Sequence, residues 1–382
     1  MKNRYADLHT HTKYSDGYLS YEDLILAADA AGIGALGITD HDRLFEGDPE
    51  EYSALTDGRV TVVRGVEIST TYQTRSTKRK IPVHVVALMY DADSPELEEA
   101  VRWNQALDSS PHVQSVLSKL SDCGLDVPTY EELHQKLGRR VEKIDIAREI
   151  CSRNDLTIDQ AYDEFLSKKG RAFVPDDRDY APMAWAVTAA IHSKAIPVLA
   201  HCLNYRLTDE ELEELVADFR AAAQDFPAAI EVSYKNYNEE QRRKVAELAA
   251  RHNLLHSCGS DYHGNGASDF LSHQFPIEIY ETLKAAHDRA FPPPPEPPIP
   301  DFPLDPITFL GSPEGGAKPF FQKMLPVLPI TLFTYIILSC FPMFFHIIPL
   351  DVYVGPSLLT LLTGLLSTLF FLCKPDRKDK VI

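Results

Sequence analysis

Histidines and carboxylates stand close together near the start of this sequence, in a pattern that can bind metal. The run Asp7-Leu8-His9-Thr10-His11-Thr12 is followed by Asp16 in Ser15-Asp16-Gly17. If residues 4–8 form a strand, His9 and His11 project from the same face, because strand side chains alternate. Two imidazoles on one face can hold one divalent ion, and Asp16 can join them across a short turn. A single His-x-His pair is weak evidence, so its meaning depends on further ligands elsewhere in the chain.

Such ligands recur beside short apolar runs that are typical of buried strands. These runs are residues 35–39, 60–66, 82–89, 196–200, 228–232 and 254–257. With the first strand at residues 4–8, they give seven predicted strands. The histidines and carboxylates within or directly after the strands form one candidate ligand set: His9, His11, Asp16, His41, Glu67, His84, His201, Asp261 and His263. A ligand set that contains histidines and carboxylates but no cysteine is suited to Mn²⁺, Fe²⁺ or Zn²⁺.

Predicted helices separate most of these strands and set the fold class. Residues 21–31 have helical spacing, with Ser20 as the cap and Asp23 three residues later. Further helices are predicted at residues 182–193, 209–223 and 239–252. Alternating strands and helices predict an α/β fold with a parallel sheet or barrel. In such a barrel the carboxyl ends of the strands meet at one mouth, which would bring the candidate ligands together.

Residues 94–170 interrupt this alternation, because they are polar and helical throughout. We therefore predict a barrel formed by residues 1–93 and 171–290, with residues 94–170 as an inserted helical subdomain that caps the substrate.

Composition limits the partners of this chain of 382 residues. Its formal net charge of −18 argues against electrostatic binding of long nucleic acid over a large surface, because such binding requires a basic surface. Small phosphorylated substrates remain compatible, because bound cations would dominate the local field. The six cysteines form no Cys-x-x-Cys motif, and no secretory signal is apparent before His9, so reduced thiols in the cytoplasm are expected. No protein partner is predictable.

The C-terminal part differs sharply in composition from the rest. A proline-rich linker is predicted at residues 291–323, and two long apolar runs follow within residues 324–373. Each run is long enough to cross a bilayer, and lysines or arginines flank the pair on both sides. This pattern predicts a transmembrane helical hairpin that holds the body at the cytoplasmic face of the plasma (inner) membrane. The alternative is one buried helix and one interfacial segment, because Pro326, Pro329 and Pro342 interrupt the first run.

Six motifs resemble a known family. The runs DLHTHTKYSDG, ITDHD, GVEIS, PVHVVAL, VLAHC and GSDYHG occur in the order seen in the polymerase and histidinol phosphatase (PHP) domain, across residues 4–290. The resemblance implies a distorted, TIM-like seven-stranded βα barrel with two or three divalent metal ions. The segments GRRVEKIDIAREI, AYDEFLSKKGRAFVP and AVTAAIHSKAIPVLAH are similar to the subfamily with a small helical insert. Members of that subfamily act on nucleoside 3′,5′-bisphosphates and, as 5′→3′ exonucleases, on short RNA.

The family pattern also implies how the ligands are divided. One ion would be bound by His9, His11, Glu67 and Asp261. Glu67 would bridge to a second ion held by His84 and His201. The third ion would be held by Asp16, His41 and His263.

The implied activity is metal-dependent hydrolysis of a phosphoester by an activated water. We assign catalytic roles to His41, His201 and His263; of these, His201 or His263 can protonate the leaving oxygen if ligation leaves it available. Candidate binders of a second phosphate are Arg139, Arg140, Arg148 and Lys235. Candidates for stacking on a base are Tyr234, Tyr237 and Phe173.

The sequence departs from the subfamily at two positions. Asp145 stands where histidine is usual, and Cys202 follows His201 where proline is usual. Asp145 therefore leaves the exact substrate open. The alternatives are a histidinol-phosphatase-like phosphomonoesterase, a metal-dependent amidohydrolase, and a non-catalytic membrane-tethered sensor. An amidohydrolase of this kind usually has a metal-bridging lysine where this chain has Glu67, and a sensor would be marked by lost ligands.

Overall fold

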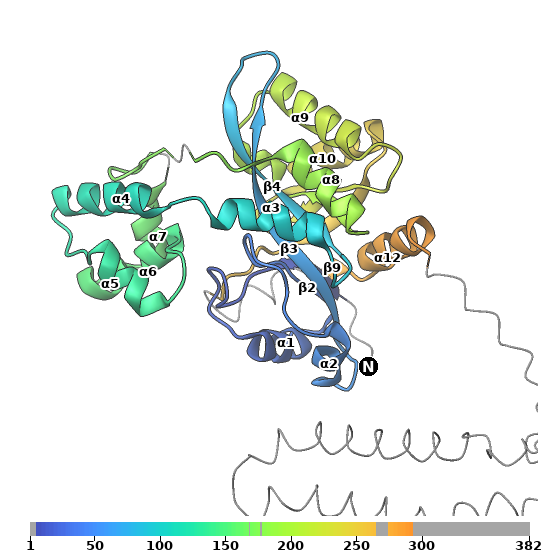
Figure 1. Ribbon diagram of the computed structural model, residues 1–382, viewed down its shortest axis with the longest axis horizontal. Coiled ribbons are helices and arrows are strands. Elements are labelled where there is room, and N and C mark those ends of the chain that lie inside the picture. Colours follow the sequence, from blue (N-terminus) through green and yellow to red (C-terminus); the bar gives the residue numbers. More distant parts are fainter. Residues whose placement is uncertain (1–4, 168, 176–177, 265–273, 293–382) are drawn as a thin grey trace, which may run out of the picture. The chain divides into compact units, whose positions relative to one another are not determined.

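The computed structural model describes residues 5–167, 169–175, 178–264 and 274–292 (Figure 1). All of them belong to one compact unit, residues 1–294. The predicted hairpin at residues 324–373, and all but the first two residues of the predicted linker, lie outside the described residues. Within the part of the chain that the structure describes, no helix has the length and apolarity needed to cross a membrane.

A nine-stranded sheet forms the centre of the unit, in the order β8-β7-β6-β4-β3-β2-β1-β9, with β5 paired to β3. Its strands are β1 (Tyr5–Thr10), β2 (Ile33–Ile38), β3 (Thr61–Gln73), β4 (Lys80–Leu88), β5 (Ala181–Pro182), β6 (Ile196–Leu199), β7 (Ala229–Tyr234), β8 (Leu255–Gly259) and β9 (Phe275–Pro276). The segment after β8 returns to β1: Thr10 bridges to Tyr262, and the Asp261 N–H donates to the His9 carbonyl at 2.9 Å. These contacts close the seven predicted strands into a barrel, confirming the α/β barrel.

One strand runs against the predicted direction. β4 is antiparallel to both β3 and β6, whereas β1, β2 and β3 are mutually parallel and β6, β7 and β8 are mutually parallel. Only residues 74–79 join β3 to β4, which is far too short for a parallel crossover. The prediction of a parallel sheet therefore fails at β4. β3 also runs seven residues beyond the predicted end at residue 66, so Glu67 lies within a strand.

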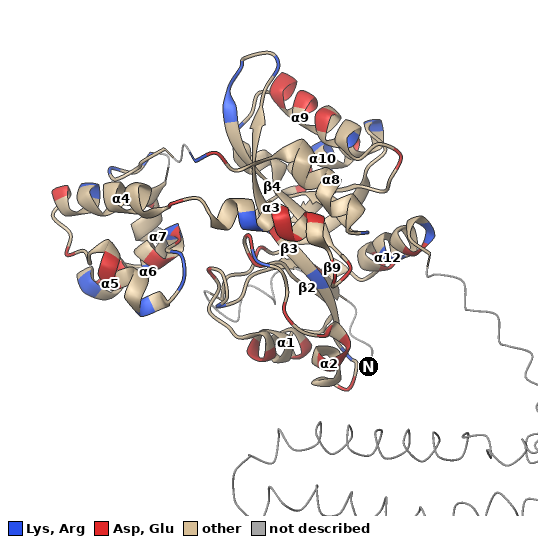
Figure 2. Ribbon diagram, viewed as in Figure 1, with Lys and Arg blue, Asp and Glu red and all other residues tan. Residues whose placement is uncertain are grey.

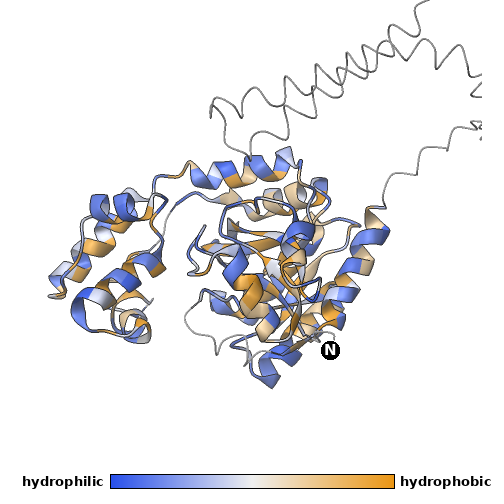
Figure 3. Cartoon of the chain, turned by 90° about the horizontal axis from the view of Figure 1, so that it is seen from below, coloured by the Kyte–Doolittle hydropathy of each residue, from blue (hydrophilic) through white to orange (hydrophobic). Residues whose placement is uncertain are grey.

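Helices cover the outside of the barrel. They are α1 (Tyr21–Ala30), α2 (Pro49–Ala54), α3 (Pro95–Gln105), α8 (Met183–His192), α9 (Asp209–Ala222), α10 (Glu239–Arg251) and α12 (Glu278–Ala290). As predicted, the Ser20 side chain accepts the Asp23 N–H and starts α1. In Figure 3 the hydrophobic colour gathers on the strands and on the helix faces that lie against them. Inside the barrel the core includes Leu8, Val63, Val86 and Val198.

The helical insert has a hydrophobic core of its own. Its elements are α4 (Ser110–Asp122), α5 (Tyr130–Leu137), α6 (Lys143–Asn154), α7 (Ile158–Gln160) and a π-helical turn, Ala161–Leu166. Val116, Leu120, Ile150 and Phe165 pack together in this core. The predicted boundary at residue 94 falls too early, because Leu97 and Val101 of α3 pack in the barrel core. The insert proper therefore begins near residue 110, and Figure 1 shows it beside the barrel at the end of α3.

Candidate active site

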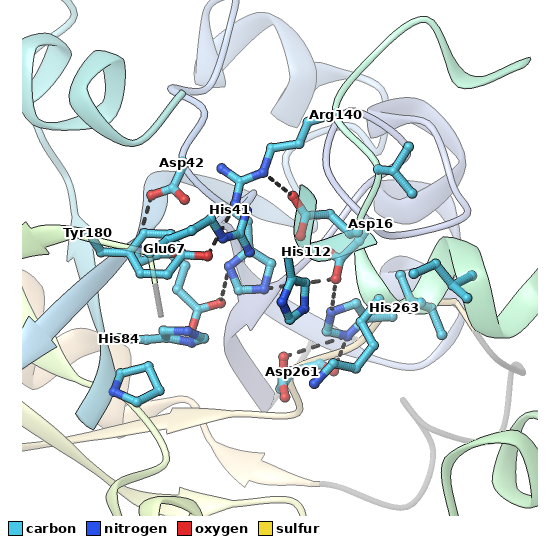
Figure 4. A pocket seen from close by; sticks show the side chains of 18 of the residues that line it. Asp16, His41, Asp42, Glu67, His84, His112, Arg140, Tyr180, Asp261 and His263 are labelled. Carbon is cyan, nitrogen blue, oxygen red and sulfur yellow. Dashed lines mark hydrogen bonds and ion pairs between the residues drawn. The ribbon is translucent and has the colours of Figure 1, made fainter. Parts of the chain in front are cut away.

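A cavity of about 660 Å³ opens between the barrel mouth and the insert. From the barrel side it is lined by ligand candidates including Asp16, His41, Glu67, His84 and Asp261, whose side chains converge in Figure 4. His9 and His11 lie fully buried beneath them. The structure thus brings all nine predicted ligands to one place, and three groups of potential donors can be distinguished there.

The first group consists of His9, His11, Glu67 and Asp261. Nε2 of His9 lies 2.9 Å from Oε2 of Glu67, and Nε2 of His11 lies 3.2 Å from the same oxygen. His11 Nε2 is also 3.2 Å from Oδ1 of Asp261. β1 supplies His9, β3 supplies Glu67, and the turn after β8 supplies Asp261. This is the same set that the family pattern assigns to one ion.

Glu67 is the centre of a second group. Its Oε1 lies 2.8 Å from Nδ1 of His84 and 3.0 Å from Nε2 of His201. His84 lies in the middle of β4, opposite Ser69 in the part of β3 that continues beyond Glu67. Nδ1 of His41 approaches the other carboxylate oxygen, Oε2, at 3.2 Å. Both oxygens of Glu67 therefore face imidazoles, as a bridging carboxylate requires.

The third group consists of Asp16, His41 and His263, with His11 beside them. Nε2 of His263 lies 3.1 Å from Oδ2 of Asp16, and Nε2 of His41 lies 3.9 Å from that oxygen. The His11 and His263 rings are stacked with their centroids 4.2 Å apart. His11 thus stands between the first and third groups.

Unpartnered buried atoms in this cluster fit the proposed divalent ions. Nε2 of His9, both ring nitrogens of His11, Nδ1 of His41 and Oε2 of Glu67 are buried without a hydrogen-bond partner within the described residues. Buried polar atoms are normally paired, so such an accumulation needs another explanation. Imidazole nitrogens and carboxylate oxygens are also the donors that Mn²⁺, Fe²⁺ and Zn²⁺ accept.

The electrostatics of the cluster couple the histidines to the acids. Burial lowers the pKa of His9, but the neighbouring Glu67 and Glu231 outweigh it and hold that pKa well above its usual range. Burial raises the pKa of Asp16, but His263 and His41 outweigh it and hold that pKa below its usual range. Negative charge is therefore maintained on the acids, which favours cation binding.

Glu231 supports this site although it was absent from the predicted set. Its side chain is 1% exposed; Oε1 lies 2.7 Å from Nδ1 of His9, and Oε2 accepts the backbone N–H of His201 at 2.6 Å. A carboxylate on Nδ1 orients the ring and leaves Nε2 as the donor toward the cluster. A Cβ at Gly259 would lie 2.4 Å from Cβ of His9 and 2.7 Å from Oε1 of Glu231, so this close approach requires glycine. Its place in a predicted strand was the only sequence signal for Glu231.

The backbone at the mouth is strained at three non-glycine residues. Asp42, His201 and Asp261 adopt positive φ angles of 46°, 29° and 52°. Such conformations are costly and concentrate at functional sites. Here each residue follows the end of a strand or its extension and turns its side chain toward the cavity that all three line.

Of the four predicted phosphate binders, only Arg140 lines the cavity. Arg139 instead forms a bidentate pair with Asp145, at 2.8 and 2.9 Å. Arg148 donates to the Asp16 carbonyl at 2.8 Å and lies over the Tyr18 ring at 3.6 Å, where it joins the insert to the barrel. Lys235 donates to the Asp261 carbonyl at 2.8 Å. Arg139, Arg148 and Lys235 thus bind protein groups around the site, and their predicted role as phosphate binders stays a prediction.

The two positions that depart from the subfamily pattern serve packing and ion pairing. Asp145 is buried beneath the cavity wall, where it caps the start of α6 and pairs with Arg139. Cys202 is fully buried in a core cluster, and burial raises the pKa of its thiol to about 12. A protonated, enclosed thiol is a poor metal ligand.

The predicted stacking aromatics do not line the cavity either. Tyr237 is buried in the same core cluster as Cys202, and the Tyr234 hydroxyl donates to Oδ2 of Asp261 at 2.9 Å. Phe173 does not contribute to the lining. The aromatic residues of the cavity are instead Tyr162, Tyr180 and Tyr205.

The insert supplies most of the cavity wall that sequence reasoning missed. The additional polar lining residues are His112, Glu142, Lys143, Tyr162, Arg178, Tyr180 and Asn204. Arg140 donates to the Tyr180 hydroxyl at 3.1 Å, and the Arg178 guanidinium lies over the Tyr180 ring at 5.0 Å. Arg140, Lys143 and Arg178 thus bring three cations to the cavity lining, where Arg140 also pairs with the lining acid Glu142 at 3.1 Å. Glu142, Lys143 and Tyr162 lie within motifs of the helical-insert subfamily, but no signal in the sequence singled them out as lining residues. Asn204 lies in the short helical turn after β6, and Arg178 and Tyr180 lie just before β5.

Comparisons with known proteins identify a family and several relatives of this chain. The family model of the PHP domain matches residues 7–149. The 5′-3′ exoribonuclease Rnm of Escherichia coli is 30% identical over 262 residues, which cover 67% of this chain and 84% of that protein. The 3′,5′-nucleoside bisphosphate phosphatase of Chromobacterium violaceum is 25% identical over 263 residues, covering 68% and 87%.

A solved structure shares the fold. It is described as an amidohydrolase from Chromobacterium violaceum with bound sulfate and no metal. It superposes with a TM-score of 0.60 at 24% identity, over 74% of this chain and 96% of that one. At this identity the match supports the barrel with its insert and does not assign a reaction.

Proposed function

This chain belongs to the PHP domain family of phosphoester hydrolases, and on that basis we propose that it acts on nucleotides carrying two phosphates. The first proposed substrate is a nucleoside 3′,5′-bisphosphate, from which the enzyme removes the 3′-phosphate. The second is a short 5′-phosphorylated oligonucleotide, which it shortens as a 5′→3′ exonuclease. The relatives named for these two activities support the proposal.

One observation carries the proposal. The cavity joins a His/carboxylate cluster to Arg140, Lys143 and Arg178. With divalent ions bound in the cluster, the cavity would offer cations to both ends of a ligand that carries two phosphates, since guanidinium and ammonium groups also bind phosphate by charge-assisted hydrogen bonds. The volume of about 660 Å³ also lies within the range of ligand pockets, roughly 300 to 1,000 Å³.

We propose that the cluster holds three divalent ions, Mn²⁺, Fe²⁺ or Zn²⁺, in the three groups described above. When bound, such ions supply an activated water and neutralise charge on the phosphoryl oxygens. The chain's own residues prepare the site: Glu231 fixes the tautomer of His9, and Glu67 faces His84 and His201 with one oxygen. Arg140 would hold the second phosphate while Tyr180 fixes its guanidinium.

Proton transfer to the leaving oxygen needs a group near the cluster. His201 and His263 remain candidates to the extent that ligation leaves a nitrogen available. His112 at the start of α4 is a further candidate: it lines the cavity but belongs to none of the three ligand groups, and Figure 4 shows it near His41 and His263. A histidine there can donate a proton near neutral pH.

A substrate panel tests the proposal. The purified full chain, loaded with Mn²⁺, is assayed for phosphate or nucleotide release from adenosine 3′,5′-bisphosphate, 5′-phosphorylated RNA, histidinol phosphate and a set of amides. We expect hydrolysis of the first two and little of the others. Preference for histidinol phosphate or for an amide, with metal bound, would replace the proposal by the corresponding alternative. Metal binding without any hydrolysis would favour the sensor.

We also propose, from sequence alone, that residues 324–373 anchor the enzyme to the cytoplasmic face of the plasma membrane. The support is two long apolar runs with basic flanks. Membrane fractions of cells that express the full chain are compared with those that express a chain ending at Pro292. The proposal predicts that only the full chain sediments with membranes and resists extraction by salt or carbonate. Recovery of both chains in the soluble fraction would refute it.

A further inference from the structure

A half-exposed tryptophan lies beside segments that line the cavity and is held in a fixed orientation. Trp103, in the last turn of α3, is 50% exposed. Its ring meets Trp185 edge to face, with centroids 5.8 Å apart at 85°, and its indole N–H donates to the Asp179 carbonyl at 3.0 Å. Two contacts therefore fix the indole while half of its surface stays open to solvent.

The neighbours of Trp103 connect it directly to the cavity. The next residue, Asn104, donates to Oδ1 of Asp42 at 2.7 Å, and its carbonyl accepts from Arg140 at 3.3 Å. Asp42 and Arg140 both line the cavity, as Figure 4 shows. Asp179, which holds the indole N–H, is followed by Tyr180 of the lining. Both neighbours of the Trp103 indole along these contacts, Asn104 and Asp179, thus adjoin or bind residues of the lining of the proposed nucleotide pocket.

A cation accompanies this aromatic surface. Lys80, the first residue of β4, forms an ion pair with Asp179 and remains 48% exposed. It precedes Ile81 and Pro82, which line the cavity. Lys78, in the exposed turn between β3 and β4, forms no ion pair with any described residue, and Figure 2 shows this turn marked by basic residues. We call Trp103, Lys80 and Asp179 the rim shelf.

We propose that the rim shelf binds one nucleotide of a single-stranded RNA, on the 3′ side of the scissile phosphate. The base stacks on the open face of Trp103, and a backbone phosphate contacts Lys80. Aromatic faces with nearby cations are the usual means of binding single strands without sequence preference. This inference rests on the proposed function and deepens it, since it names the feature that would favour an oligonucleotide over a mononucleotide.

The charges on the shelf favour stacking as the main contact. Lys80 is balanced by Asp179, so the shelf itself is close to neutral. A long polyanion would gain little there, in keeping with the net charge of −18 for the whole chain. The proposal requires that a short strand with its first phosphates in the cavity places its next base on Trp103.

Steady-state kinetics of Trp103→Ala test the proposal on two substrates. The substrates are a 5′-phosphorylated RNA of a few nucleotides and adenosine 3′,5′-bisphosphate. Loss of one stacked base lowers kcat/KM for the RNA by about 5- to 150-fold. The value for the bisphosphate, which does not reach the shelf, changes less than about twofold. Trp103→Phe, which keeps an aromatic face, should retain most of the RNA activity.

Phe226→Ala is the matched control, because Phe226 is an exposed aromatic on the segment between α9 and β7, outside the cavity lining. It should leave both substrates unaffected. An equal loss on both substrates with Trp103→Ala would overturn the proposal, as would unchanged RNA kinetics. Hydrolysis of the bisphosphate alone by the unaltered enzyme would also overturn it, because no second nucleotide would then bind productively.

Fluorescence separates this inference from the proposed function. The chain has two tryptophans, Trp103 and Trp185, so stacking of a base on Trp103 is reported directly. In a His41→Ala background, which prevents turnover, the RNA should quench the emission and the bisphosphate should not. Trp103→Phe should remove the quenching. Quenching without turnover in the unaltered enzyme would refute only the proposed function, whereas absence of quenching would refute the shelf.

Discussion

Replacing Glu231 by glutamine should weaken metal binding by reversing the tautomer of one ligand. Glu231 accepts at both oxygens, from Nδ1 of His9 at 2.7 Å and from the His201 backbone N–H at 2.6 Å. Glutamine offers one acceptor and one donor. The backbone N–H can only donate, so the amide oxygen must face His201 and the amide NH₂ must face His9. Nδ1 of His9 then becomes an acceptor, and the proton moves to Nε2, the atom that points at Glu67.

The expected magnitude follows from the role of the carboxylate. In a metal-binding histidine, loss of the hydrogen-bond acceptor on the ring nitrogen that does not bind the metal typically lowers metal affinity by about 10- to 100-fold, or about 1.4 to 2.7 kcal/mol. The other orientation of the glutamine amide is no better. Its NH₂ group would then face the backbone N–H of His201, and two buried donors would lie against each other. We therefore expect Glu231→Gln to weaken one metal site and to leave the other two less affected.

Calorimetric titration of the metal-free protein with Mn²⁺ measures this directly, with kcat followed against Mn²⁺ concentration in parallel. High Mn²⁺ should restore part of the activity. Asp7→Asn is the matched control, since Asp7 is an equally buried acid on β1 that accepts the backbone N–H groups of Ser260 at 2.9 Å and of His9 at 3.5 Å. Metal affinity that is unchanged in Glu231→Gln, or reduced as much in Asp7→Asn, would refute the tautomer argument.

Three further predictions concern the cavity. His41→Ala should lower kcat by at least about 100-fold, because His41 faces both Asp16 and Glu67. Activity within threefold of the unaltered enzyme would contradict a role for the third group of metal ligands. Arg140→Met should raise KM for adenosine 3′,5′-bisphosphate by about 10- to 150-fold, because a lost hydrogen bond to a charged group costs about 1.5 to 3 kcal/mol. It should barely affect 3′-AMP, and equal effects on both substrates would show that Arg140 does not contact the second phosphate. Chelation with EDTA should lower the melting temperature and abolish activity, since bound ions stabilise only the folded state. Calorimetry with and without added Mn²⁺ measures this shift. An unchanged melting temperature would count against tight metal binding.

The barrel and its ligand cluster were predictable because they depend on local patterns. Short apolar runs with a polar residue at or near their ends indicate strands that deliver side chains to one mouth, and His9, His41 and Asp261 reach it in this way. The direction of β4 was missed, although the six residues that join it to β3 exclude a parallel crossover. His84 still reaches the cluster, because the side chains of an antiparallel neighbour can face the same mouth.

The substrate wall was not predictable from the same signals. Arg139 and Arg140 are adjacent in sequence, yet Arg139 pairs with the buried Asp145 and Arg140 lines the cavity. Their partners come from α6 and from the segment before β5, whose packing depends on the tertiary structure of the insert. Glu231 was likewise indistinguishable from an ordinary strand residue until its two contacts were seen.

Phosphate release from adenosine 3′,5′-bisphosphate, measured together with metal content, tests the central claim most directly. The purified full chain is stripped of metal, reloaded with increasing Mn²⁺, and assayed at each step by elemental analysis and colorimetric phosphate detection. We predict that release begins only as the ions bind and rises as the three groups of the His/carboxylate cluster become occupied. A folded, fully loaded protein that releases no phosphate from this substrate or from 5′-phosphorylated RNA would contradict the account.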